Sequence, residues 1–327
     1  MDKVSHRRAS ALRVAQRAGT LTMAACLLFS CTQGGSDPQP GPGRSARESL
    51  TAPGTASGRY ASPVPPPRSD KILGRLPSVP VAGNAPALAR QLELAAATLR
   101  DRDAAANDVR RAGEFQQLAV GTLATASDTF RRKVTSRLRP QTALIVRGAV
   151  RAASALRAMT SPQRRLPRWR IVAPPPAGEL LRYYRVAQRR TGVPWTYLAA
   201  IHLVETRMGR IRGASTAGAL GPMQFLPATW DLYGAGGNIN DPRDAILAAA
   251  RLLKANGAPG DMRGSLRHYN QSTRYVRAVS EYARTMTRSS SAYRGYWHWR
   301  VLYRHARGTY VLPVGYPAVR PVLMPAG

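Results

Sequence analysis

Apolar residues in the second half of the sequence recur at the three- and four-residue spacing of helices. Leu180, Leu181 and Tyr184 fit one face of a first helix, and a second helix starts at Pro194, whose fixed φ suits a first helical position. Asp241 is suited to cap a third helix, because its carboxylate can accept from amides of the first turn. The pattern predicts helices around 180–184, over 194–205, over 241–255, over 262–269 and over 273–286.

Two earlier segments differ from this helical part. Residues 32–83 are dominated by Pro, Gly, Ser and Ala, and the run Pro63–Pro67 is incompatible with a helix interior, so we expect an extended tether. Residues 84–176 carry apolar side chains at helical spacing as far as Ala158, and prolines then end the pattern. A helical region therefore precedes the last helical domain. In the extension that follows this domain, Tyr310–Pro313 is predicted to be a short strand.

The amino terminus has the pattern of an export signal. Four arginines up to Arg17 precede the run Leu21–Phe29, which is apolar with one exception. This run is shorter than the roughly 20 apolar residues that a membrane-spanning helix needs. Leu28 to Cys31 then resembles a bacterial lipobox, so we expect Cys31 to be lipidated. The alternative is an ordinary cleaved signal in which Cys31 has no role.

The chain is strongly basic, with 49 Lys and Arg against 17 Asp and Glu and a formal net charge of +32. Such a charge suits an anionic neighbourhood, which can be nucleic acid, a membrane surface or the polymers of a cell wall. Nearly all the basic residues are arginine, so genomic base composition explains part of the excess. An export signal separates the protein from nucleic acid. We therefore expect anionic wall polymers or phospholipid headgroups as partners and no nucleic acid.

Glu205 lies near the carboxyl end of the otherwise apolar second helix. Burial and the negative end of the helix dipole both disfavour an ionised carboxylate, so we expect the pKa of this side chain to be raised. A carboxylic acid that is neutral near physiological pH is suited to protonate a glycosidic oxygen. The competing interpretation is an ion pair of Glu205 with Arg207 or Arg210 on the helix surface.

Three stretches around this residue carry a family resemblance. Val204–Gly209 reads VETRMG, Gly218–Trp230 reads GALGPMQFLPATW, and Tyr269-Asn270 follows. In order and spacing they resemble the three signature stretches of the bacterial soluble and membrane-bound lytic transglycosylases, most of all the membrane-bound lytic murein transglycosylases. The resemblance covers about 177–288. It implies a lysozyme-like fold, peptidoglycan glycan strands as substrate, and no cofactor.

The resemblance also implies roles for individual residues. Glu205 corresponds to the catalytic acid/base, and the second stretch corresponds to the wall of the sugar groove. The third stretch supplies a tyrosine near the catalytic Glu, with an asparagine beside it. Substrate contacts are therefore expected at Ser215, Met223, Gln224, Tyr269 and Asn270.

The second stretch also makes physical sense by itself. Gly218 and Gly221 permit a tight loop whose backbone approaches a ligand closely, and Gln224 offers a donor and an acceptor to an acetamido group. We expect two aromatic residues of this stretch, Phe225 and Trp230, to belong to the core. Met223 would then be the exposed apolar contact.

The number of carboxylates bears on the reaction type. Glycoside hydrolases normally place two carboxylates about 5 to 9.5 Å apart across the scissile bond. Between 177 and 288, Glu205 is the one acid inside a signature stretch, and Asp241 and Asp244 look like helix-start residues. One carboxylate suits a mechanism in which Glu205 protonates the leaving oxygen and then deprotonates the C6 hydroxyl of the same sugar. The product would be a 1,6-anhydromuramoyl end.

Metal or histidine chemistry is not expected. The segment Gly234–Asp241 has too few carboxylates for a calcium cage, so we expect no metal. His202 and His268 are each expected to pack or to support the site rather than to react.

Two other functions stay open from the sequence. One is a muramidase on the same fold, in which Asp231, Asp241 or Asp244 orients a water. The other is a wall-binding lipoprotein that binds sugar without turnover. In all cases we expect the protein in the cell envelope, exported and lipid-anchored to the outer face of the cytoplasmic membrane.

The expected fold class is mainly α. The predicted organisation is an export signal with a lipobox over 1–31, a disordered tether over 32–83, a helical region over 84–176, a lysozyme-like lytic transglycosylase domain over 177–288 and a C-terminal extension over 289–327.

Overall fold

The structure is a computed structural model that describes residues 80–324 of the chain. The predicted export signal, the lipobox and nearly all of the predicted tether lie outside these residues. The described part is mainly helical, which confirms the expected fold class. Within 80–324, the helices are either too short or too polar to cross a bilayer.

Four helices form the region before the last domain, as the apolar pattern predicts. Three of them start at a cap or a proline: the Asn84 side chain accepts from the Ala87 amide at 2.9 Å, Ser127 accepts from the Phe130 amide at 3.2 Å, and Pro140 opens the last helix. The helices are α2 (Ala85–Arg100), α3 (Ala106–Thr125), α4 (Asp128–Thr135) and α5 (Pro140–Arg157).

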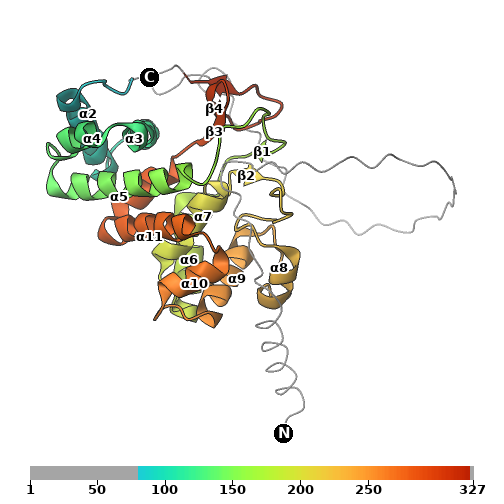
Figure 1. The fold of residues 1–327 in the computed structure, drawn as a ribbon. Helices are drawn as coiled ribbons and strands as arrows, with labels where there is room; N and C mark the ends of the chain where they lie inside the picture. The colour runs from blue at the N-terminus through green and yellow to red at the C-terminus, as the bar shows by residue number, and fades with distance from the viewer. Residues whose placement is uncertain (1–79, 325–327) are drawn as a thin grey trace, which may run out of the picture. The chain divides into compact units, whose positions relative to one another are not determined.

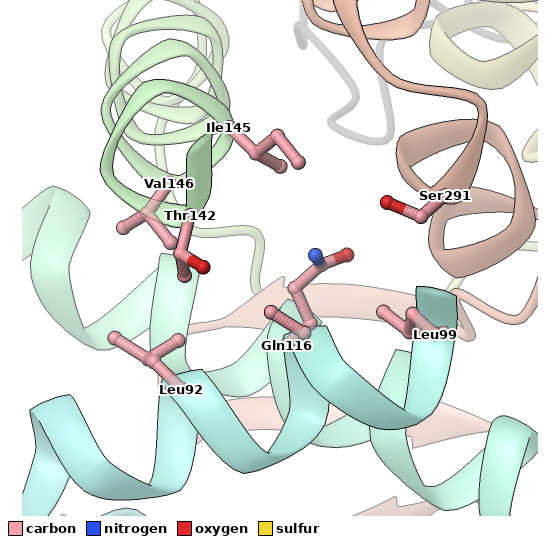
Figure 2. A pocket seen from close by; sticks show the side chains of 8 residues that line it. Leu92, Leu99, Gln116, Thr142, Ile145, Val146 and Ser291 are labelled. Carbon is pink, nitrogen blue, oxygen red and sulfur yellow. The ribbon is translucent and has the colours of Figure 1, made fainter. Parts of the chain in front are cut away.

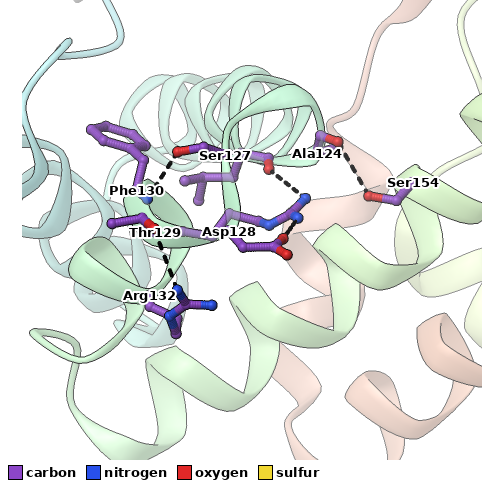
Figure 3. A network of polar contacts seen from close by, with 9 residues as sticks. Ala124, Ser127, Asp128, Thr129, Phe130, Arg132 and Ser154 are labelled. Carbon is purple, nitrogen blue, oxygen red and sulfur yellow. Dashed lines mark hydrogen bonds and ion pairs between the residues drawn. The ribbon is translucent and has the colours of Figure 1, made fainter.

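Polar contacts at the end of α3 join three of these helices. Figure 3 shows the Ser127 cap of α4 beside the last turn of α3. In the same view the Ser154 hydroxyl of α5 donates to the Ala124 carbonyl of α3 at 3.3 Å. The turn between α3 and α4 is therefore fixed against α5 as well as by its own cap.

The last domain contains all five helices that the periodicity predicts. Two further helices were not predicted, because α8 has only 7 residues and α12 follows α11 after a single residue. The helices are α6 (Ala177–Thr191), α7 (Trp195–Thr206), α8 (Pro227–Tyr233), α9 (Pro242–Ala255), α10 (Met262–Tyr269), α11 (Thr273–Arg288) and α12 (Ser290–Trp297).

Helix α7 is apolar around its whole circumference, and the structure explains why. It packs against α6, α9, α11 and α12, and every side chain from Leu198 to Thr206 is buried. Helix α11 in turn lies along α5 (Figure 1), so one hydrophobic core runs through 84–176 and 177–288. The division of these two ranges into separate domains stays a prediction.

Two small antiparallel sheets flank the helices. β1 (Arg170–Ile171) pairs with β2 (Ile211–Arg212), and β3 (Val301–His305), β4 (Gly308–Leu312) and β5 (Val322–Leu323) form the second sheet. β4 confirms the strand predicted near Tyr310, whereas β3 and β5 were not predicted. The two sheets share a second core of Trp169, Ile171, Ile211, Val301, Tyr303, Leu312 and Tyr316.

The C-terminal extension is therefore packed against the segment that leads into α6. The Tyr316 hydroxyl donates to the Pro167 carbonyl at 2.5 Å, and the Ile171 amide donates to the Tyr316 carbonyl at 3.0 Å. Tyr303 donates to the Arg165 carbonyl at 2.9 Å. These bonds connect residues 138 to 149 positions apart, which is farther than the last domain, 177–288, is long.

A small cavity lies among α2, α3, α5 and α12 (Figure 2). Its volume of ≈ 10 Å³ is about what a single water molecule occupies. Leu92, Leu99 and Ile145 line it together with the polar side chains of Gln116 and Thr142. None of its lining residues belongs to a signature stretch, so it is a packing feature of the core and not a sugar site.

The contact between α5 and α11 gives a first prediction. A Cβ at Gly148 would lie 2.4 Å from Cγ2 of Thr285, whose hydroxyl is held by the Tyr282 carbonyl at 2.8 Å and the Tyr296 hydroxyl at 2.9 Å. Gly148→Ala should therefore lower the free energy of unfolding by about 1–3 kcal/mol, the usual cost of overpacking. Urea denaturation measures this change.

Gly121→Ala is the matched control for this substitution. Gly121 is also inside a helix, but a Cβ there meets nothing within 4 Å. This variant should gain roughly 0.5–1 kcal/mol, because alanine loses less backbone entropy than glycine. Equal effects at the two positions would show that α5 and α11 are not in close contact.

Candidate active site

Glu205 lies in the last turn of α7, with only 1% of its surface exposed. The Tyr275 hydroxyl, from the first turn of α11, donates to Oε1 of Glu205 at 2.7 Å. Burial and the carboxyl end of a helix both favour the neutral form of such a group. The structure therefore supplies the environment on which the prediction of a raised pKa rests, and that prediction stays open.

Sequence reasoning missed Tyr275. It is the third residue of the predicted fifth helix and belongs to none of the three signature stretches, so no local signal marks it. Ser272 caps this helix by accepting from the Tyr275 amide at 3.4 Å, which fixes the tyrosine in the first turn. Only the packing of α11 against α7 brings its hydroxyl to Glu205.

Tyr269 lies near Glu205, as the resemblance implies, and its predicted contact with substrate stays a prediction. Its ring stacks on the Tyr275 ring, with centroids 6.4 Å apart and planes at 4°, so it does lie near Glu205. Its hydroxyl, however, donates to the Met223 carbonyl at 2.6 Å. Burial, followed by the charge of Glu205, raises the pKa of Tyr269 well above its ordinary value. Tyr269 therefore acts as a neutral hydrogen-bond donor that holds the second stretch.

A second hydroxyl holds the neighbouring carbonyl of this stretch. Thr206, directly after Glu205, donates to the Pro222 carbonyl at 2.6 Å and accepts from the Gly209 amide at 3.1 Å. The carbonyls of two consecutive loop residues are thus each held by a hydroxyl group. Thr206 of α7 binds the Pro222 carbonyl, and Tyr269 of α10 binds the Met223 carbonyl. The backbone of the loop is positioned against Glu205 by these two bonds.

The loop itself is a tight hairpin. The backbones of Leu220 and Phe225 exchange hydrogen bonds of 2.8 and 2.9 Å, and Gly218 and Gly221 have φ of +79° and +73°. A Cβ on Gly221 would lie 1.9 Å from the Ile239 carbonyl oxygen. The close approach expected at Gly221 is therefore to the protein's own backbone and not to a ligand. A Cβ on Gly218 meets nothing within 4 Å, so that side of the loop is open.

The expected exposure of Met223 is wrong. Its side chain is fully buried in the core, and its carbonyl accepts the hydrogen bond from Tyr269. Phe225 is buried as expected, whereas Trp230 is half-buried and packs edge-on against Phe225 with centroids 5.5 Å apart. Met223 therefore shapes the loop from within, and Trp230 is the more exposed apolar side chain of this stretch.

The predicted polar contacts are also partly used inside the protein. Gln224, with 1% exposure, donates from Nε2 to the Gly221 carbonyl at 2.9 Å. The Ser215 hydroxyl accepts from the Ala217 and Ala219 amides at 3.2 and 2.9 Å, which shapes the approach to the loop. Their roles in substrate binding stay predictions.

Asn270 ends α10 next to Tyr269 and is 7% exposed. Its Oδ1 accepts from the Ser272 amide at 2.9 Å and so connects α10 to the first turn of α11. This bond lies three residues before Tyr275. Asn270 therefore helps to set where the partner of Glu205 begins its helix, and its predicted contact with substrate stays open.

The acids of the muramidase alternative have other partners. Asp241 caps α9 by accepting from the Arg243 and Asp244 amides at 2.9 and 3.0 Å, which confirms its predicted helix-start role. Asp244 accepts from the Asn238 amide at 3.0 Å, and Asp231 is exposed on α8. The first two carboxylates thus serve the local backbone.

The two arginines proposed as surface partners of Glu205 face aromatic rings. The Arg207 guanidinium lies 5.7 Å from the centroid of Trp299, and that of Arg210 lies 5.4 Å from the centroid of Trp297. Arg207 is 6% exposed, so the competing interpretation of an ion pair on the helix surface does not hold for it. These side chains bind the C-terminal segment.

The two histidines near the signature stretches differ. His202 is fully buried, and its Nδ1 lies 2.7 Å from the Tyr184 hydroxyl, so its predicted packing role is confirmed. Burial, helped by the charges of Arg212 and Arg210, lowers the pKa of His202 to about 3. His268 is exposed on α10, so it does not pack in the core, and its expected supporting role stays a prediction. Among residues 80–324, no group of three or more His, Cys, Asp and Glu could hold a metal.

Comparison with known families agrees with this geometry. Residues 182–290 match the family described as Transglycosylase SLT domain. The match contains α7, the hairpin loop, α10 and α11, and therefore every contact of Glu205 described above. It supports a lytic transglycosylase-like family with a lysozyme-like domain that acts on peptidoglycan. Comparisons with curated proteins and with solved structures gave no match.

The buried neutral His202 makes a prediction for pH. Its pKa is about 3 in the folded state and near 6.5 when unfolded, so between these values only the unfolded chain binds the proton. The free energy of unfolding should therefore fall as pH decreases below about 6.5, by up to ~1.4 kcal/mol per pH unit from this group. His202→Gln should flatten this dependence in urea titrations between pH 7 and 4.5.

His268→Gln provides the comparison, because it removes one exposed histidine and leaves the buried His202 in place. A parent-like slope in His202→Gln would mean that His202 is protonated in the folded protein.

Proposed function

We propose that this chain is a peptidoglycan lytic transglycosylase. It cleaves the β-1,4 bond between N-acetylmuramic acid and N-acetylglucosamine and leaves 1,6-anhydromuramoyl ends, with Glu205 as the catalytic acid/base. The observation that carries this proposal is the buried carboxyl of Glu205, hydrogen-bonded to Tyr275 inside the segment that matches the transglycosylase family.

Glu205 acts twice in this reaction. As a neutral acid it donates its proton to the glycosidic oxygen, and the bond to C1 of the muramic acid breaks. As a carboxylate it then takes the proton of the C6 hydroxyl of the same sugar, whose oxygen bonds to C1. Proton and bonds balance without water, and the side chain returns to its neutral form. The Tyr275 hydroxyl donates to Oε1 and holds the carboxyl in one orientation through both steps.

The local bonds of Asp241 and Asp244 support a mechanism with one carboxylate. Asp241 accepts from two amides of the first turn of α9, and Asp244 accepts from the Asn238 amide of the preceding loop, so both carboxylates have structural partners. A hydrolase would need one of these groups, or the exposed Asp231, to orient a water across the scissile bond.

We further propose that the protein acts in the cell envelope. We also propose that, within the family, it is most similar to the membrane-bound lytic murein transglycosylases. Lipidation at Cys31 would anchor the chain to the outer face of the cytoplasmic membrane, and the segment 32–83 would give it reach to the wall. The net charge of +32 suits anionic wall polymers near that surface.

Product mass tests the reaction type. Purified sacculi treated with the protein should release muropeptides with 1,6-anhydro ends, which are lighter than hydrolysed ends by one water. Glu205→Gln should abolish turnover and still co-sediment with sacculi, because the amide keeps the shape but cannot donate a proton. Reducing ends in place of anhydro ends would establish the muramidase instead. Binding without products from the parent protein would establish a wall-binding protein.

Two tyrosine variants separate the two hydroxyls near Glu205. Tyr275→Phe should lower kcat about 10- to 100-fold with little change in KM, because the catalytic carboxyl loses its orientation. Tyr269→Phe should act more on KM, because it frees the Met223 carbonyl and with it the loop. Kinetics on soluble glycan strands measure both values.

The two variants are matched, since each removes one hydroxyl from a buried, stacked ring at a similar cost of about 1 kcal/mol. An identical kinetic pattern in both would contradict the separate roles.

A further inference from the structure

The chain makes an unusual turn directly after Glu205. Arg207, Met208 and Gly209 have φ of 53°, 60° and 80°, so three consecutive residues are left-handed and two of them carry a Cβ. A left-handed residue with a Cβ costs roughly 1–2 kcal/mol. Such a conformation persists only where the surroundings fix it. The carbonyl of His202 accepts from the amides of both Arg207 and Met208, which ends helix α7. These backbone bonds do not fix the side chains of the turn.

The arginine side chains of the turn are fixed by stacking. Arg207 is buried, and its Nε and Nη1 find no acceptor among the described protein groups. Its main partner is the face of Trp299, at 5.7 Å. Arg210 stacks on Trp297 at 5.4 Å and also donates to the Arg207 carbonyl at 3.3 Å. Burial lowers the pKa of Arg207 to about 10 and that of Arg210 to about 9, so both remain cations at neutral pH.

The tryptophans are themselves held in place. The Trp297 indole donates to the Pro175 carbonyl at 3.0 Å, just before α6. Beyond Trp299, the Arg300 amide donates to the Gln117 side chain at 2.7 Å, and Gln117 donates back to the Arg300 carbonyl at 2.8 Å. The segment is therefore tied to the start of α6 on one side and to α3 on the other. It forms a rigid platform for the two cations.

The turn connects this platform to the reacting group. Glu205 precedes Arg207 by two residues, and Thr206 between them holds the Pro222 carbonyl of the hairpin loop. A shift of the turn would thus move the end of α7 and the loop together. Trp297 and Trp299 lie beyond residue 290, where the match to the transglycosylase family ends.

We propose that Trp297 and Trp299 form a clamp that positions the catalytic carboxyl, with Arg207 and Arg210 as the residues they hold. These four are positioning residues and do not touch substrate. The C-terminal extension then helps to position the catalytic group. The proposal rests on the proposed function, because the group it positions is Glu205.

Arg207→Gly in the full chain is the decisive variant. Glycine adopts φ near 53° without strain, and the buried cation with its unpaired donors disappears, so stability should be kept or raised. The variant, however, loses the contact between the Arg207 guanidinium and Trp299 that fixes the turn. We expect kcat on soluble glycan strands to fall about 10- to 100-fold, the scale of loss from a slightly misplaced catalytic group, with KM little changed. Trp299→Leu should show the same kinetic pattern with lower stability.

Two comparisons separate positioning from simple destabilisation. Arg207→Lys keeps a cation over the Trp299 ring and should recover part of kcat. Val134→Ala removes buried volume in α4, outside the turn and the platform, so it should lower the melting temperature and leave kcat per folded molecule unchanged. The pH profile of kcat should shift in Arg207→Gly and not in Val134→Ala.

Hydrogen exchange of the peptide 203–212 tests the clamp without any turnover. Exchange should be faster in Arg207→Gly and Trp299→Leu than in the parent protein and in Val134→Ala. Parent-like exchange and parent-like kcat in Arg207→Gly would overturn the clamp and leave the proposed function standing. A parent protein without turnover would refute the proposed function, and the exchange data would still decide whether the clamp exists.

Discussion

The hydrogen bond from Tyr275 to Glu205 depends on a helix that is buried on every side. A carboxyl group at the end of such a helix has little water to orient it, so its position is set by protein groups alone. Tyr275 can do this because α11 is itself fixed. Its far side lies against α5, where Gly148 permits the backbone of one helix to approach Thr285 of the other. The region before the last domain thus supports the orientation of one carboxyl group.

The loop opposite Glu205 is held through its backbone. Thr206 and Tyr269 bind the carbonyls of Pro222 and Met223, while the Met223 side chain fills the core. Hydrogen bonds to carbonyls fix a main chain more sharply than apolar packing does, because they have direction. The open side of the loop at Gly218 is therefore presented with a defined shape.

Segments outside the family match, 182–290, also stabilise the fold. The C-terminal extension, 289–327, contacts the segment before α6 through Tyr303 and Tyr316, and it completes a second core. Trp297 and Trp299 of this extension reach the turn that follows Glu205. The matched range 182–290 is therefore not a self-contained unit here, since both of its ends are fixed by residues beyond it.

Local patterns in the sequence predicted most helices of the last domain and marked Glu205 as the candidate acid/base. Apolar spacing and caps such as Asp241 are local, so they predicted five of the seven helices α6–α12, and the VETRMG stretch pointed to Glu205. The tertiary structure decided what the side chains touch. Tyr275 lies 70 residues from Glu205 and carries no motif, and the apolar side chain of Met223 is buried in the core while its carbonyl binds Tyr269. An ion pair of Arg207 with Glu205 at the helix surface was an interpretation that the sequence left open. In the fold Arg207 is buried, and its guanidinium lies over the ring of Trp299. Contacts between distant segments depend on how helices pack, and periodicity within one segment holds no information about the partner.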